Sequence, residues 1–185
     1  MLSLFNQLRW ADIVIILIIG RCIYIGIKRG LAVEFFKLLG TLLAVFTCLH
    51  YYSKLGAFLS KPEIVPTELG NFVAFIFIWS IFLFFSFIIR EMFLFLIKLQ
   101  PLAVLDKWGG AFLGGIRSLF LSGMILLILM ISQISFFDKG AKTCFFGQYA
   151  IPTVTKTYAF VIERLINPFF SSEKINEEIF RTIEK

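Results

Sequence analysis

Two long runs without a charged residue constrain this chain more than any other feature of its sequence. One is Phe72–Ile89, which ends at Arg90, and the other is Ser118–Phe137, which lies between Arg117 and Asp138. A helix that crosses a bilayer needs about 20 mostly apolar residues. Both runs approach or reach that length without a charge. We therefore expect a polytopic membrane protein.

The composition agrees with this expectation. Apolar residues make up 59% of the chain and charged residues 16%, whereas a soluble domain is about 45–50% apolar and about 25% charged. The net charge is +6. Because the lysines and arginines are scattered between apolar runs, we interpret them as charges that orient the protein in a bilayer, and we expect no nucleic-acid partner.

The first third of the chain contains two further candidate spans. Trp10–Ile27 and Leu31–Tyr52 are each apolar apart from a few polar residues. Gly30 between them suits a helix end or a tight turn, so the pattern predicts a helical hairpin. Besides Asp12 near the start, the charged residues gather around the turn: Arg21, Lys28, Arg29, Glu34 and Lys37.

Two interpretations of these charges stay open. Arg21 is expected at the depth of Glu34, where it can pair with that carboxylate across the hairpin or extend toward the headgroups. Glu34 and Lys37 are three residues apart and share a helix face. The charges either stabilise the turn at the membrane interface or form a functional polar site.

The whole chain is predicted to be all-α, a bundle of four transmembrane helices plus a C-terminal amphipathic helix. The expected spans are about 10–27, 31–52, 71–97 and 110–135, within a membrane domain over 1–137, with Ser53–Leu69 as a loop. Residues 138–185 form the remaining tail. Apolar residues recur there at helical spacing, with Pro152 and Pro168 close to the two ends of the pattern: Ile151, Val154, Tyr158, Ile162, Leu165 and Phe169. Such a helix lies on the membrane surface or packs against the bundle.

Lysine and arginine accumulate on the cytoplasmic side of membrane proteins. The first and third connections are the more basic ones, so we expect them to face the cytoplasm. With four spans, both termini would then lie outside the cytoplasm.

The segment Val104–Ser118 combines two opposite charges with four glycines. On one helix, Asp106 and Arg117 fall within about 20° of each other. Gly110 and Gly114 form a GxxxG pattern that permits close helix approach. Asp106 is also a candidate N-cap of its own helix. The segment indicates either a closely packed helix or a polar groove that handles an ion or polar substrate.

Two stretches resemble the colicin V production protein (CvpA) family of bacterial inner-membrane proteins. The first is Asp12, followed by Gly26-Ile27-Lys28-Arg29-Gly30 and Glu34. The second is Leu105-Asp106-Lys107, followed by Gly110, Gly114 and Arg117. Ser118 stands where the family often has glycine. The resemblance covers about residues 10–135 and implies a multi-pass protein of the bacterial inner membrane, with a role in toxin production or export and envelope function.

Three classes of function follow. The first is a membrane component that supports export of a secreted peptide, contacting other membrane proteins or itself through the glycine face. The second is a transporter or channel subunit, in which the charges converge on one polar cavity: Asp12, Arg21, Glu34, Asp106 and Arg117. The third, an enzyme, lacks a metal-ligand cluster, a nucleophile motif or a phosphate loop, so we expect no enzymatic activity and no cofactor.

Overall fold

The structure, a computed structural model, describes residues 10–61, 66–96, 103–132 and 144–166, together with Asn176 and Ile179. Over these residues the regular elements are all helices, which confirms the all-α prediction. In chain order they are α2 (Trp10–Arg29), α3 (Leu31–Leu59), α4 (Thr67–Leu96), α5 (Ala103–Ile131), α7 (Gly147–Val161) and the π-helical turn η1 (Ile162–Ile166). Each of the four predicted spans therefore falls on a helix.

The helix boundaries differ from the predictions in one place that matters. The predicted loop Ser53–Leu69 was too long, because α3 continues to Leu59 and α4 begins at Thr67. Gly56 of α3 lies directly against Asn71 of α4. Packing between the two helices thus extends both of them beyond the apolar runs that the sequence displays.

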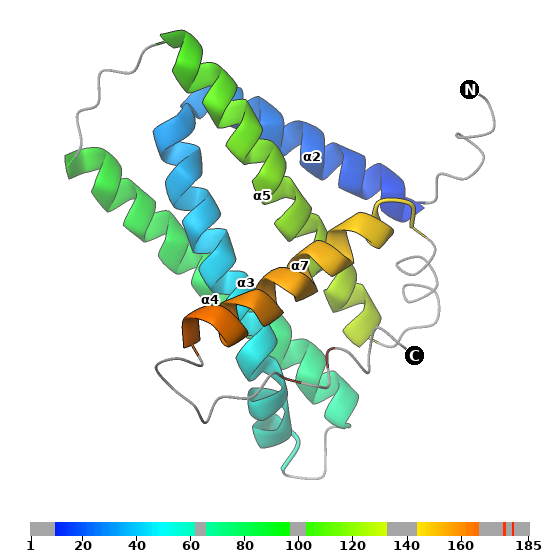
Figure 1. Ribbon diagram of the computed structural model, residues 1–185. Coiled ribbons are helices and arrows are strands. Elements are labelled where there is room, and N and C mark those ends of the chain that lie inside the picture. Colours follow the sequence, from blue (N-terminus) through cyan, green and yellow to red (C-terminus); the bar gives the residue numbers. More distant parts are fainter. Residues whose placement is uncertain are drawn as a thin grey trace, which may run out of the picture.

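Figure 1 shows how the helices are arranged. α2 and α3 diverge from a common vertex at Gly30, and α5 begins beside that vertex. The two most extensive helix contacts join α3 to α4 and α2 to α5, so the fold consists of two antiparallel pairs linked through α3 and α5. α7 crosses α3 and α5 near the middle of the bundle.

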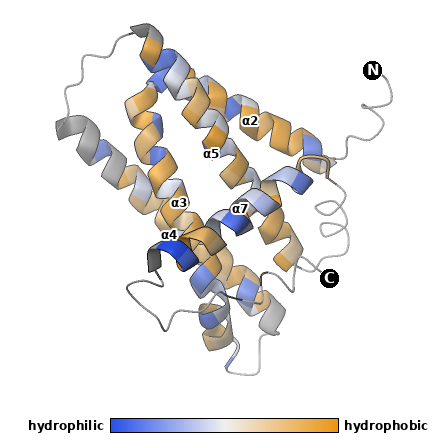
Figure 2. Ribbon diagram, in the orientation of Figure 1, coloured by the Kyte–Doolittle hydropathy of each residue, from blue (hydrophilic) through white to orange (hydrophobic). Residues whose placement is uncertain are grey.

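Three of these helices are long and apolar enough to cross a membrane, over Leu31–Leu59, Leu69–Ile88 and Leu105–Ile131. Figure 2 shows that apolar residues dominate them along their length, whereas α7 is more mixed. The helix α2 is not among the three, so the prediction of four spans is met for three helices. This number of helices applies to the part of the chain that the structure describes.

The amphipathic pattern predicted for the C-terminal region faces the bundle. Ile151, Val154, Tyr158 and Ile162 are all buried, while the side chains of Leu165 and Phe169 lie outside the described part. Gly123 of α5 provides the seat for α7, since a Cβ there would meet Val154 and the backbone of Ala150. α7 also begins ahead of Pro152 rather than at it.

Candidate functional site

The turn at Gly30 is closed by a side chain from a distant helix. Gly30 has a φ of 83°, which L side chains rarely adopt, and it offers α3 no capping side chain. The free N–H of Leu31 instead donates to Asp106 Oδ1 of α5 at 2.7 Å. Asp106 therefore caps α3, which corrects the prediction that it caps its own helix. A carboxylate there also complements the positive end of the α3 dipole.

One turn further along α3, a fully buried carboxylate holds two cations. Glu34 is 0% exposed, and its two oxygens contact different partners. Oε1 pairs with Lys37 Nζ on the same helix, and Oε2 accepts from Arg117 Nη1 of α5 at 2.7 Å. We call Glu34, Lys37 and Arg117 the Glu34 triad. Since Arg117 comes from α5, the triad ties α3 to α5 beside the Gly30 turn.

The glycines of the two family motifs lie against each other. A Cβ on Gly110 would meet the carbonyl oxygen of Gly26 at 2.2 Å, and one on Gly114 would meet the carbonyl oxygen of Cys22 at 2.7 Å. The backbones of α2 and α5 therefore touch along this line, as GxxxG packing allows. The predicted glycine face is thus occupied by α2 of the same chain. Contact of this face with other membrane proteins or with a second copy stays a prediction.

A pocket of about 150 Å³ opens beside the Glu34 triad, between α3, α4 and α5. It is lined by two cations, two hydroxyls and two apolar side chains: Lys37, Arg117, Thr41, Ser86, Leu83 and Phe87. The pocket is smaller than the range of about 300–1,000 Å³ usual for drug-sized ligands. It suits a small polar group.

At the other end of α2, the Asp12 carboxylate accepts hydrogen bonds from residues directly before α7. Its fully buried Oδ1 accepts from the backbone N–H of Phe146 at 3.2 Å and from the Cys144 thiol at 2.9 Å. Burial, and then the hydrogen bond to Asp12, raise the pKa of the Cys144 thiol to about 11. Asp12 thereby holds the residues directly before α7 against the start of α2. No local sequence pattern indicates this pairing, because Cys144 lies 132 residues from Asp12.

The remaining predicted site residues are exposed. Arg21 is exposed on α2, and Lys28 and Arg29 are exposed at its last turn. The proposed pairing of Arg21 with Glu34 is therefore wrong, since Arg117 takes that place. The five charges that a transporter site would bring together do not converge on one cavity, because Asp12 is held at the opposite end of α2 from Asp106.

Sequence reasoning also missed a buried polar contact between α3 and α7. His50 Nδ1 lies 3.2 Å from the Tyr158 hydroxyl, which accepts a hydrogen bond from the N–H of Asn176. The Asn176 side chain donates to the carbonyl of Leu49 at 3.1 Å. These contacts attach Tyr158 of α7 and Asn176 to the C-terminal half of α3. Within the described residues, no group of three or more His, Cys, Asp or Glu side chains is placed to hold a metal ion.

In the part of the chain that the structure describes, the regular elements are all helices and three of them are of membrane-spanning length, which are the features of a multi-pass membrane protein. The sequence profile described as "Colicin V production protein" matches residues 11–155. The chain therefore belongs to the colicin V production protein family, which confirms the resemblance noted from its two motifs. No curated protein and no solved structure matched the chain.

Proposed function

We propose that this protein is a non-enzymatic component of a bacterial inner-membrane complex that supports the production or export of a secreted toxin peptide. The observation that carries the proposal is the family match over residues 11–155. The matched range includes the place where α2, α3 and α5 meet, which we call the Gly30 junction. There the three helices are joined by Asp106, by the Glu34 triad and by the contact of Gly110 with Gly26. An arrangement in which the charges serve helix contacts fits a scaffold better than a transport path.

We further propose that α2 is the fourth span. It has 20 residues, enough for a bilayer, and lies against α5. Its exposed residues are largely apolar, among them Ile13, Ile16 and Leu17. The exposed Lys28 and Arg29 at its end favour a cytoplasmic position for the Gly30 junction. Both termini would then lie outside the cytoplasm.

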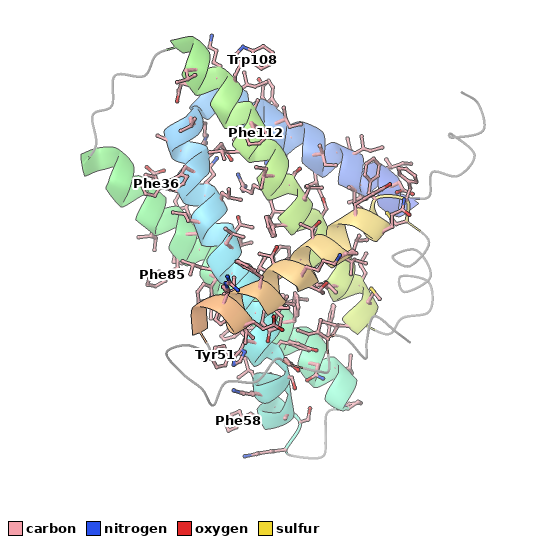
Figure 3. The ribbon with its side chains drawn as sticks, in the orientation of Figure 1. Phe36, Tyr51, Phe58, Phe85, Trp108 and Phe112 are labelled. Atoms are coloured by element: carbon pink, nitrogen blue, oxygen red, sulfur yellow. The ribbon has the colours of Figure 1, made fainter. Side chains whose placement is uncertain are left out.

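The surface most suited to a partner is the outer face of α4. Only 11% of its spanning window is buried within the chain. Its exposed side chains include Phe77, Phe84 and Phe85, and Figure 3 shows Phe85 pointing away from the bundle. Because α2 of the same chain already packs on Gly110 and Gly114, a partner helix or a second copy would pack on this face of α4. In the absence of such a partner, lipid would cover the face.

Complementation tests this proposal. The full chain is expressed in a bacterium that lacks its own family member and produces a secreted toxin peptide, and the secreted activity is measured. We expect the wild-type chain to restore production. Asp106→Ala and Arg117→Leu should each impair it at matched membrane abundance, and Gly115→Ala should not, because a Cβ there meets nothing within 4 Å. Wild-type production by both junction variants would refute the assignment of the site.

A further inference from the structure

Two cations of the Glu34 triad line the pocket, but the triad contains a single carboxylate, so one positive charge is not balanced within it. Both oxygens of Glu34 are engaged, one by Lys37 and one by Arg117. Two cations thus share one carboxylate. An ammonium has three N–H donors and a guanidinium has five, so a single carboxylate leaves several of them available. Both cations also line the pocket. Its chemistry therefore favours an anion that accepts several hydrogen bonds.

Of the two hydroxyls on the wall, that of Ser86 can donate a hydrogen bond to the same ligand. Ser86 of α4 approaches α3 closely because Gly40 has no side chain, and a Cβ on Gly40 would overlap with the Ser86 hydroxyl. Ser86 thereby sits opposite Lys37 on the pocket wall. Thr41 donates its hydroxyl hydrogen to the carbonyl of Lys37, which fixes the side chain in place.

The other side of the pocket borders the surface that α4 presents to lipid. Leu83 and Phe87 line the pocket and are also exposed, at 38% and 55%. A ligand with an anionic head and apolar chains could place the head against Lys37 and Arg117 and the chains along α4. A purely polar anion would leave the apolar half of this site unused.

The depth of the pocket matches a lipid headgroup. Lys37 lies roughly 10 Å from the Gly30 turn along α3, at 1.5 Å per residue. At the same end of the bundle, Lys28, Arg29 and Lys107 are exposed. Trp108, 76% exposed, projects outward from α5 beside them, as Figure 3 shows. Basic residues and tryptophan at one end of a helical bundle are typical of an interface with anionic lipid.

We propose that this pocket binds the phosphate of an anionic membrane lipid between Lys37, Arg117 and Ser86, with the acyl chains lying along α4. The site is a lateral one, entered from the bilayer. It goes beyond the role in toxin production proposed above and does not depend on it, since it rests on the lining of the pocket and on the side chains exposed around it.

Native mass spectrometry of the full chain, released from a neutral detergent, measures this binding. The probes are phosphatidylglycerol, phosphatidylcholine and inorganic phosphate. We expect phosphatidylglycerol to bind at least about tenfold more tightly than phosphatidylcholine, and Lys37→Gln to reduce its affinity by a similar factor through loss of a charged hydrogen bond. The matched control is Lys54→Gln, an exposed lysine near the other end of α3.

A second variant keeps the test decisive if Lys37→Gln does not fold. Leu83→Trp fills the pocket from the exposed side of α4 without changing a charge, and it should also abolish the preference for phosphatidylglycerol. Equal affinity for the two lipids, or an unchanged preference in both pocket variants, would overturn the proposal. Strong binding of inorganic phosphate that Lys37→Gln removes, with no preference between the lipids, would also overturn it by assigning the site to free phosphate.

Discussion

The two ends of α2 use the same device in different surroundings. At the Gly30 end, Asp106 of α5 accepts the first free N–H of α3; at the other end, Asp12 of α2 accepts the N–H of Phe146 before α7. In both cases a carboxylate from one helix caps the start of another that is distant in sequence. Each carboxylate thus fixes an angle between helices that no local sequence signal sets.

The surroundings differ in charge and in packing. The Gly30 end has glycines that bring two backbones into contact, and a triad in which two cations surround the buried Glu34. The described partners of the fully buried Asp12 are a backbone N–H and the Cys144 thiol. The Gly30 end is therefore a closely packed, cation-rich junction of three helices. The Asp12 end is one of several contacts that attach α7 to the bundle. We expect the largest loss of stability from breaking the buried ion pair at the junction.

The largest effect is expected from Arg117→Leu. Removing one partner of a buried ion pair costs on the order of 3–5 kcal/mol, because Glu34 would keep only Lys37. The free energy of unfolding, measured by steric trapping in bicelles, reports the loss. Arg117→Lys should recover part of it, since it restores a charge. A loss no larger than that of Arg21→Leu on the exposed face of α2 would contradict the assigned pairing.

The glycine contact allows a sharper comparison with a matched control. Gly110→Ala should destabilise the fold by about 1–3 kcal/mol, because the added methyl group meets the Gly26 carbonyl of α2. Gly115→Ala, on the same helix but with open space around it, should stabilise by up to about 1 kcal/mol through helix propensity. Thermal melts in detergent compare the two. The same sign for both substitutions would show that α2 and α5 are not in close contact.

The two caps can be separated by where they act. Asp106→Ala should cost about 0.5–2 kcal/mol and speed hydrogen exchange at the Leu31 amide. Asp12→Ala should cost about 1–3 kcal/mol, because it leaves buried donors unsatisfied, and it should speed exchange at Phe146. Neither substitution should affect the other amide. Faster exchange at both sites in either variant would mean that the two ends are coupled rather than independent.

The smallest effect concerns pH at the Asp12 end. Because burial and Asp12 raise the pKa of Cys144 from 9.0 to about 11, the protonated thiol favours the folded state. Its contribution to the free energy of unfolding is complete below about pH 9 and is lost as the pH rises through about 11. In a Cys22→Ala, Cys48→Ala background, maleimide should label Cys144 slowly at pH 8 and faster above pH 10. Labelling at pH 8 as fast as in the denatured chain would contradict the buried hydrogen bond.

Much of this fold follows from local sequence patterns. Apolar runs predicted the helices, and Gly30 predicted the turn. Helical spacing predicted that Ile151, Val154 and Tyr158 share the apolar face of a helix that lies on the membrane surface or packs against the bundle, and the structure has them buried against the bundle. The same spacing placed Asp106 and Arg117 on one stripe of α5, and in the structure both reach α3.

The contacts between helices were harder to predict. Arg21 was expected either to pair with Glu34 across the hairpin or to extend toward the headgroups, but Arg117, 83 residues away from Glu34, pairs with that carboxylate. The bond from Cys144 to Asp12 spans 132 residues. Helical periodicity says which side of a helix is polar, but not which neighbour faces it. One clue was available: a glycine between two helices cannot cap the second helix with a side chain, so the cap must come from elsewhere.

The central claim is that Glu34 and Arg117 join α3 to α5 at the Gly30 junction. A double-mutant cycle on the unfolding free energy, with Glu34→Gln, Arg117→Leu and the double variant, tests it most directly. We predict a coupling energy of about 2 kcal/mol, within the range for residues in direct contact. Additive effects, with a coupling energy below about 0.5 kcal/mol, would contradict the account, because they would show that Glu34 and Arg117 do not interact.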